Sequence, residues 1–123
     1  MKNRNNGIIF KEEKELKTEV NGVVFEWDDN KDKLNIKNHG ISFKEALYVF
    51  FDEYYLEDFD ELHSGIEDRY NIIGRIKQNK VIYVVCLYKT GDLIRLISAR
   101  PAEPNEEEKY YEQFNKNESK KHR

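Results

Sequence analysis

The chain has 123 residues, of which 38% are hydrophobic and 37% are charged, with a formal net charge of −3 at pH 7. This length suits one domain with a modest core. The longest apolar run, Val81–Tyr88, is far shorter than the roughly 20 residues that cross a bilayer, and no apolar signal region follows Met1. We therefore expect a cytoplasmic protein that does not enter the membrane. The single cysteine, Cys86, lies inside the apolar run and is expected to be a core residue.

The acidic total hides a basic central segment. Between Arg69 and Arg100 there are seven basic residues and one acidic residue, so the rest of the chain is strongly acidic. A local concentration of positive charge favours an anionic partner, whatever the sum over the whole chain. We therefore predict that the working surface lies between Arg69 and Arg100 and that its partner is anionic, such as a nucleic acid.

The N-terminal third contains short predicted elements. Residues 1–20 are rich in Asn, Lys and Glu and are interpreted as a charged appendage, in which 10–19 can form a short helix. Val23–Trp27 is β-branched and aromatic, which predicts a strand. Asp28 or Asp29 can cap a helix over Lys31–Asn38, and Gly40 provides the left-handed residue that ends it.

A second helix and an acidic segment come next. Ser42 and Glu45 have the spacing of a capping box, and the apolar residues after Ser42 recur at helical spacing. Residues 52–61 interleave acidic with aromatic side chains. This pattern is typical of a partly exposed strand, and a polar loop through His63–Gly65 follows it.

The second half of the chain is dominated by sheet. Three strand-like runs, 69–74, 80–88 and 93–99, are separated by short polar spacers and predict an antiparallel meander. Pro104 fits the first turn of a last helix over about 105–114, and 116–123 is expected to be a disordered tail. The order β-α-α-β-β-β-β-α predicts an α+β domain over 21–115. Its two N-terminal helices are expected to pack on one face of an antiparallel sheet, with the other face available.

Several motif classes do not fit the residues. Asp28–Asp32 superficially resembles the start of a calcium loop, but Lys33 stands where glycine is needed and His39 where glutamate is needed. His39, His63 and His122 lack the spacing of metal ligands. No strand-turn-helix elbow surrounds a serine, and no glycine-rich phosphate loop is present. We therefore expect neither a metal nor another cofactor, and the remaining Arg, Glu, His and Tyr suit phosphoryl chemistry.

An ordered set of residues runs from about position 23 to position 112. It comprises Phe25-Glu-Trp-Asp28, Lys31, Asn35, His39-Gly40, Phe43-x-x-Ala46, Glu67-x-Arg69, Ile73-Gly74-Arg75, Arg95-x-Ile97-Ser-Ala-Arg100 and Glu106-x-x-x-Tyr110. The set and its spacing resemble the BrnT family of bacterial toxins. That resemblance implies a RelE-like ribonuclease of a type II toxin-antitoxin system, which inhibits translation. It also implies RNA as the substrate and a DNA-binding, BrnA-like antitoxin as the partner, with which the toxin can form a heterotetramer.

RNA cleavage without a metal needs a base for the 2′-hydroxyl, donors for the charge that develops on the phosphate, and an acid for the leaving oxygen. We assign proton transfer to Glu67 or His39 and an orienting hydroxyl to Tyr110. A guanidinium can hold two phosphate oxygens, so we assign phosphate binding to three arginines (Arg69, Arg95 and Arg100). Three further basic residues are predicted to bind RNA (Arg75, Lys77 and Lys80).

These assignments have structural alternatives. Glu67 and Arg69 can form a surface ion pair, and His39 can simply end the first helix. Arg95 and Arg100 are five residues apart, so a regular strand would point them to opposite faces. Either one of them is structural and ties a strand end to the acidic last helix, or a bulge intervenes.

The chain departs from the family pattern near its C-terminus and before Gly40. Toxins of this type have a lysine before the His-Gly pair and a basic run after Ser-Ala-Arg, where this chain has Asn38, Pro101 and Glu106–Glu108. Acidic residues beside the site would repel RNA. The alternative function is therefore an interaction module with weak or no catalysis, which binds the antitoxin and acts in transcriptional autoregulation. Tyr54–Phe59 is the predicted antitoxin surface.

Overall fold

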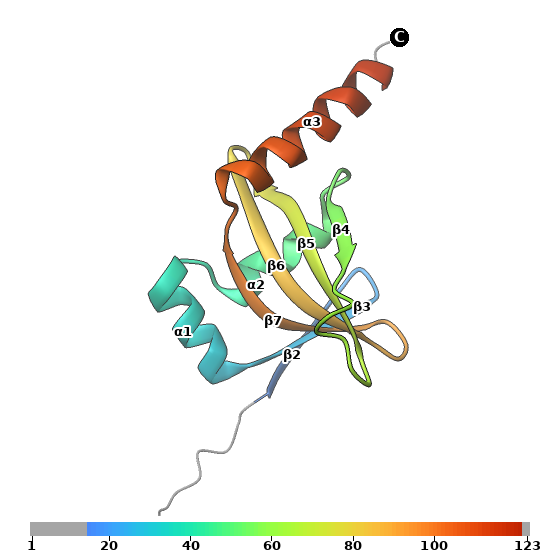
Figure 1. The fold of residues 1–123 in the computed structure, drawn as a ribbon. Helices are drawn as coiled ribbons and strands as arrows, with labels where there is room; N and C mark the ends of the chain where they lie inside the picture. Colours follow the sequence, from blue (N-terminus) through green and yellow to red (C-terminus); the bar gives the residue numbers. More distant parts are fainter. Residues whose placement is uncertain (1–14, 122–123) are drawn as a thin grey trace, which may run out of the picture.

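The computed structural model describes residues 15–121 and contains one six-stranded sheet and three α-helices (Figure 1). Across the sheet the strands follow the order β2-β3-β7-β6-β5-β4. The strands are β2 (Glu15–Val20), β3 (Val23–Asp28), β4 (Leu56–Phe59), β5 (Asp68–Lys77), β6 (Lys80–Lys89) and β7 (Leu93–Pro101). The helices are α1 (Asp29–His39), α2 (Phe43–Ala46), the 3-10 helix η1 (Leu47–Phe51) and α3 (Pro104–Lys121). As far as the described residues go, no helix is long and apolar enough to cross a bilayer.

The sheet is mixed, which corrects the antiparallel sheet expected from the sequence. From β3 onward the elements follow the predicted order, and the β5-β6-β7 meander is antiparallel as predicted. However, β3 pairs in parallel with β7, from Val24 beside Leu93 to Glu26 beside Arg95. The long connection between these two strands carries α1, α2, η1 and the strands β4, β5 and β6, and a connection of that length permits parallel pairing.

The sheet begins earlier in the chain than predicted. Residues 15–20 form β2, which pairs with β3 in an antiparallel hairpin, so this part of the expected appendage belongs to the fold and is not helical. Asn21 and Gly22 connect the two strands with φ values of 51° and 85°. A two-residue turn with both φ values positive matches the twist of a hairpin. Residues 1–14 of the expected appendage lie outside the described residues.

The predicted caps of the N-terminal helices are confirmed. The carboxylate of Asp28 accepts a hydrogen bond from the Lys31 N–H at 3.3 Å, and Gly40 ends α1 with φ of 70°. Ser42 Oγ accepts a hydrogen bond from the Glu45 N–H at 3.0 Å. The α-helix that Ser42 caps is only four residues long before the chain tightens into η1.

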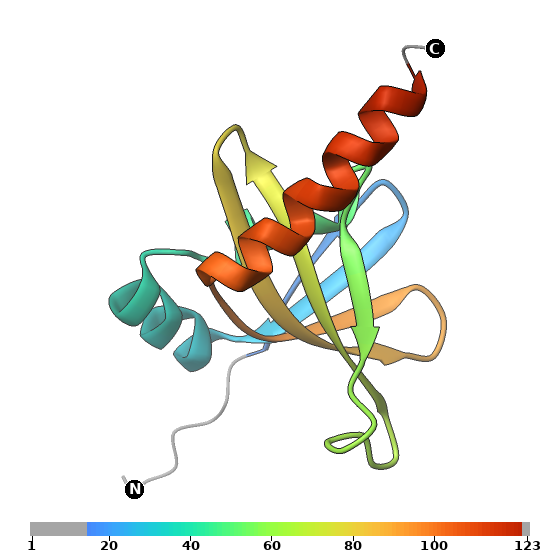
Figure 2. The same ribbon diagram turned by 45° about the horizontal axis from the view of Figure 1, so that its top comes forward.

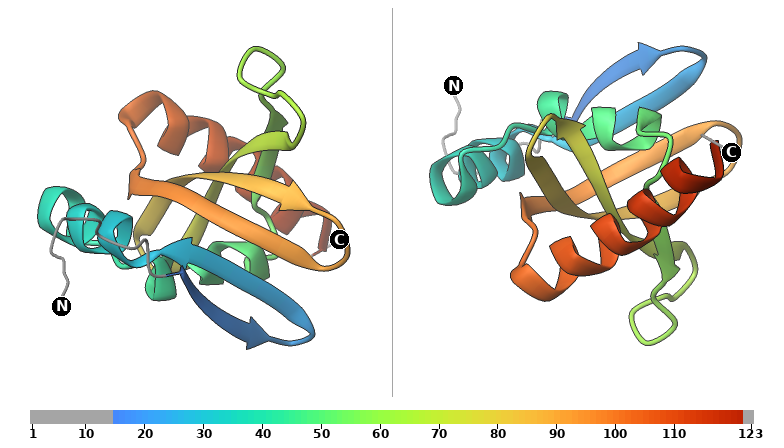
Figure 3. Two further views of the ribbon diagram at one scale, coloured as in Figure 1. Left: turned by 90° about the horizontal axis from the view of Figure 1, so that it is seen from below. Right: turned by 90° about the horizontal axis from the view of Figure 1, so that it is seen from above.

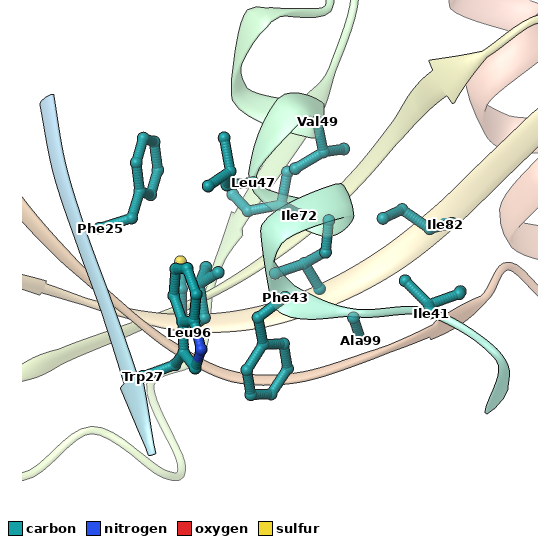
Figure 4. Packing of buried hydrophobic residues seen from close by; sticks show 13 residues of the cluster. Phe25, Trp27, Ile41, Phe43, Leu47, Val49, Ile72, Ile82, Leu96 and Ala99 are labelled. Atoms are coloured by element: carbon teal, nitrogen blue, oxygen red, sulfur yellow. The ribbon is translucent and has the colours of Figure 1, made fainter. Parts of the chain in front are cut away.

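Alternation along β5 and β6 gives the sheet two apolar faces. Ile72 and Ile82 face the main core, which residues of α2 and η1 fill (Figure 4). Ile73 and Val81 face a second core beneath α3, where Tyr110 is completely buried. Figure 3 shows α2 and η1 on one side of these strands and α3 on the other. We call the side that α3 partly covers the α3 face.

Three buried residues lie at close contacts of the main core: Asn35, Gly74 and Cys86. Asn35 of α1 donates to the Ile41 carbonyl oxygen at 2.8 Å and accepts the Ala99 N–H at 3.0 Å, which fastens α1 to β7. A Cβ atom added to Gly74 would lie 2.4 Å from Val49 Cγ2, so only glycine lets β5 pass this close to η1. Cys86 is fully buried, as predicted, and burial raises the pKa of its thiol to about 12.

The last helix is longer than predicted. Pro104 stands in its first turn as expected, but the helix continues to Lys121, through residues for which a disordered tail was expected. Polar contacts with the segment after η1 hold its final turns. Tyr54 donates its hydroxyl hydrogen to Glu118, and Lys121 forms an ion pair with Glu53. Residues 122–123 of the expected tail lie outside the described residues.

Candidate functional site

A bulge in β7 places Arg95 and Arg100 on the same face of the sheet. Tyr83 pairs with Arg100 and Leu87 pairs with Arg95, and the register between β6 and β7 shifts by one residue between these two pairs. Tyr83 and Leu87 are four residues apart on β6 and therefore share a face. The structure contains both alternatives left open by the sequence: the bulge intervenes, and Arg100 is tied to the acidic last helix through Glu106.

Arg69 lies in line with Arg95 on this α3 face. Leu87 is the β6 partner of Arg69 as well as of Arg95, and Glu26 is the β3 partner of Arg95. Since neighbouring strands are about 4.8 Å apart, the Cα atoms of Arg69 and Arg95, two strands apart, are separated by about 10 Å. The row formed by Arg69, Leu87, Arg95 and Glu26 lies away from α3, whereas Arg100 lies at the end of β7 that leads into α3.

Arg95 is held in a group of charges that we call the Glu26 cluster (Glu15, Lys17, Glu26, Lys89 and Arg95). Its Nη1 lies 2.9 Å from Glu15 Oε1 and 3.1 Å from Glu26 Oε2. Lys89 Nζ is also 3.1 Å from Glu26, whose side chain is only 3% exposed. Burial alone would raise the pKa of Glu26, but the hydrogen bonds with Lys89 and Arg95 lower it below its usual range. The cluster therefore keeps a buried carboxylate ionised and engages Arg95 on two sides.

Arg100 is paired with the first turns of α3. Its two terminal nitrogens reach Glu106 Oε1 and Oε2 at 2.8 and 2.9 Å, in a bidentate geometry. The guanidinium carbon lies 4.1 Å from the centroid of the Tyr83 ring. The hydrogen bonds from Arg100 lower the pKa of Glu106. Bidentate pairing uses the same fork that would hold a phosphate, so Arg100 is engaged by the chain itself.

Arg69 is less fully paired than the other two arginines. Its Nε is buried and makes no hydrogen bond within the described part of the chain, and Asp60 Oδ2 lies 3.9 Å from it. Glu67, two residues earlier, is 43% exposed and lies 3.6 Å from Lys89 Nζ. Arg69 and Glu67 thus remain accessible beside the Glu26 cluster. We call Asp60, His63, Glu67 and Arg69 the Arg69 site.

The other predicted site residues lie elsewhere. His39 is the exposed last residue of α1, an element that packs against β3 and β7 from the main core. Lys77 and Lys80 lie 3.6 and 3.2 Å from Glu45 Oε2, near the turn between β5 and β6. Arg75 is on the α3 face, but its guanidinium lies over the Phe114 ring at 4.7 Å.

Tyr110 does not present its hydroxyl to the arginines. It is completely buried and donates a hydrogen bond to Asp52 Oδ2 at 2.7 Å. The same oxygen accepts a hydrogen bond from the backbone N–H of Arg75 at 2.8 Å. Burial, together with this hydrogen bond, raises the pKa of Tyr110. This geometry gives Tyr110 a role in packing α3 onto the sheet and does not support the predicted role in orienting RNA.

The Arg69 site lies outside the two clefts that flank α3. Two clefts flank α3: one of about 620 Å³ is lined in part by Arg75 and Phe114, and another of about 470 Å³ by Tyr83 and Glu106. Neither is lined by Arg69. Among residues 15–121, no group of three or more His, Cys, Asp or Glu is arranged to hold a metal ion.

Sequence reasoning missed three residues of this region. Asp60 and His63 were assigned to a strand end and a polar loop, although their spacing of three residues is that of a turn in which side chains can meet. Glu26 was quoted in the family pattern without a partner. A charged residue between aromatic neighbours in a strand, such as Glu26, is the available signal, because such a charge is buried only with a partner.

A family model confirms the resemblance to the BrnT toxins that the sequence shows. A family model described as the ribonuclease toxin BrnT of type II toxin-antitoxin systems matches residues 27–106, more than half of the chain. Among solved structures, the chain is similar to the Brucella abortus ribonuclease toxin BrnT, with 24% sequence identity and a TM-score of 0.49, over 63% of this chain and 92% of that one. The comparison with curated proteins gave no match. The chain therefore belongs to the BrnT family of ribonuclease toxins of type II toxin-antitoxin systems.

Proposed function

We propose that this chain is a RelE-like, metal-independent endoribonuclease that acts in the cytoplasm of a bacterium and inhibits translation by cutting RNA. The observation that supports the proposal most directly is the bulge in β7, because it brings Arg95 and Arg100 to the face that carries Arg69. A basic face built from neighbouring strands can follow a phosphate backbone, which carries a charge at every nucleotide.

Within this face, the cut is assigned to the Arg69 site. Arg69 holds the phosphate and stabilises the charge that develops on its oxygens, since its guanidinium is the least fully paired of the three. Glu67 is the base that takes the proton of the 2′-hydroxyl, because its carboxylate is exposed and next to Lys89. Neither His39 nor Tyr110 enters the proposal.

Basic residues at the other end of the sheet are assigned to binding the RNA strand. Arg75 and Lys77 line the cleft beside α3, and Lys80 faces Lys77 across the β5-β6 turn. Each is partly neutralised or covered, Lys77 and Lys80 by Glu45 and Arg75 by Phe114. We assign them a weak contribution to affinity and none to the chemical step.

The partner of this toxin is proposed to be a BrnA-like antitoxin with a DNA-binding domain, in a heterotetramer. The edge strand β4 is the proposed docking edge, because in the described structure it pairs only with β5. The proposed docking edge does not include all of the predicted surface Tyr54–Phe59. Tyr54 and Leu56 pack into the second core and Tyr55 against the main core, whereas Phe59 is 45% exposed.

The proposal is tested by expressing the full chain alone and by incubating the purified protein with RNA in EDTA. We expect growth arrest and cleavage. We expect Arg69→Ala to lower the cleavage rate by about 10²–10³-fold, the loss typical of removing one hydrogen-bond donor to a developing oxyanion. Lys33→Ala is the matched control, since Lys33 is an exposed cation on α1 that pairs with Asp29. Cleavage that disappears in EDTA would contradict metal independence, and equal rates for Arg69→Ala and wild type would remove Arg69 from the site.

A second function is favoured by a specific observation. Carboxylates of the chain itself engage Arg95 and Arg100, so two of three arginines are turned away from an external phosphate. This arrangement suits an interaction module that binds the antitoxin and acts in transcriptional autoregulation without cutting RNA. Normal growth on expression, no RNA cleavage, and tight binding to the product of a neighbouring small gene would establish this function in place of the first.

A further inference from the structure

The loop between β4 and β5 is closed by its own hydrogen bonds beside Arg69. The Asp60 N–H donates to the Arg69 carbonyl oxygen at 2.8 Å. Ser64 Oγ donates to the Asp60 carbonyl oxygen at 2.7 Å and accepts the Arg69 N–H at 3.0 Å. The loop projects beyond the strands (Figure 2), yet these contacts fix its first residue and its midpoint to the strand that carries Arg69.

Inside the loop, the carboxylate of Asp60 lies close to both a histidine and an arginine. Asp60 Oδ2 lies 2.9 Å from His63 Nδ1 and 3.9 Å from Arg69 Nε. Asp60 Oδ1 also accepts the His63 backbone N–H at 3.2 Å. The carboxylate of Asp60 is 16% exposed and the His63 ring is 66% exposed. The ring is thus held through Nδ1, while Nε2 is the nitrogen left for a partner in solution.

This pairing has a chemical consequence. A carboxylate on Nδ1 fixes the tautomer and the orientation of an imidazole. Burial would raise the pKa of Asp60, but the hydrogen bonds with His63 lower it, so Asp60 is a carboxylate. With Glu67 as the base, the proposed site still lacked an acid for the leaving oxygen.

We propose that His63 is the general acid of RNA cleavage and that Asp60 is its positioning residue, an inference that rests on the proposed ribonuclease function. As the 2′-oxygen forms its bond to phosphorus, its proton passes to Glu67. The bond from phosphorus to the 5′-oxygen breaks, and that oxygen takes the proton from His63 Nε2. The products are a 2′,3′-cyclic phosphate and a 5′-hydroxyl, and solvent returns His63 and Glu67 to their starting protonation states.

The test compares two RNA oligonucleotides at a site that the wild-type protein cuts. One has the natural 5′-oxygen, and the other has sulfur in its place, which leaves without being protonated. We expect His63→Ala and His63→Gln to slow cleavage of the oxygen substrate by about 10²–10⁴-fold, and cleavage of the sulfur substrate by less than about tenfold. Asp60→Asn keeps an oxygen acceptor for Nδ1 and is expected to slow only the oxygen substrate, by less than His63→Ala does.

The control is Glu61→Gln, an exposed neighbour in the same loop, which should cut both substrates at the wild-type rate. A thermal melt of each variant shows that the fold is intact. If both His63 variants cut the oxygen substrate at the wild-type rate, or slow both substrates equally, His63 is not the acid. If the wild-type protein cuts no RNA, the proposed function itself fails, which is a different result from a wild-type cut that survives loss of His63.

Discussion

Lys89 connects the Glu26 cluster with the Arg69 site, but the two groups differ in how their charges are satisfied. Lys89 contacts Glu26 of the cluster at 3.1 Å and Glu67 of the Arg69 site at 3.6 Å. Glu26 is 3% exposed, whereas Glu67 is 43% exposed. One carboxylate is therefore a structural ion that its partners surround, and the other is open to solvent. A count of basic residues in the sequence cannot separate these two situations.

The largest expected effect is on the free energy of unfolding, when the carboxylates of Glu26 and Glu67 are removed in two separate variants. Glu26→Ala leaves Lys89 and Arg95 adjacent without their shared anion, and breaking a buried pair from one side costs about 3 kcal/mol. Glu67→Ala breaks an exposed pair and should cost about 0.5 kcal/mol or less. Urea unfolding of the two variants measures the difference in the free energy of unfolding. Equal losses of stability in the two variants would mean that Glu26 and Glu67 contribute equally to the stability of the fold, which would contradict the distinction between them.

The same contrast shows which parts of the fold the sequence could predict. The caps at Asp28 and Ser42 and the β5-β6-β7 meander depend on neighbouring residues and on alternation, so local patterns are sufficient to predict them. The β2-β3 hairpin also carries a local signal, because Asn21-Gly22 between two valines is typical of a two-residue turn. That signal was outweighed by the charged composition of residues 1–20.

The parallel pairing of β3 with β7 was not predictable in this way. It brings Glu26 beside Arg95 across a long stretch of sequence, and alternation within either strand contains no information on which strands become neighbours. The length of α3 was missed for a similar reason, since its last turns depend on contacts with Glu53 and Tyr54. The candidate site shows the same limit, because Asp60 meets Arg69 only once the loop is closed.

A smaller effect is expected on how the free energy of unfolding depends on pH, and it also separates Glu26 from Glu67. The pKa of Glu26 is lowered in the folded state, so its contribution to stability is complete above its usual value near 4.5 and is lost as pH falls through the lowered value. We expect the wild-type free energy of unfolding to decline below about pH 4.5, the usual carboxylate range. In Glu26→Gln this decline should be shallower, measured by urea unfolding at a series of pH values. Glu67→Gln is the control and should keep the wild-type slope, whereas a shallower slope for both would contradict the distinction.

The smallest expected effect is on the salt dependence of RNA binding, measured with an RNA whose 2′-hydroxyls are methylated so that it cannot be cut. For single strands, each phosphate contact contributes about −0.7 to the slope of log affinity against log salt. If Arg69 binds phosphate while carboxylates engage Arg95 and Arg100, the wild-type slope should correspond to few contacts, about −0.7 to −1.4. Arg69→Gln should flatten it by about 0.7, and Glu106→Gln should steepen it by about 0.7, because Arg100 is then released to bind a phosphate. An unchanged slope in Glu106→Gln would mean that Glu106 does not withhold Arg100 from RNA. The acidic start of α3 would then be compatible with full activity, and the case for a purely interacting protein would lose its main structural support.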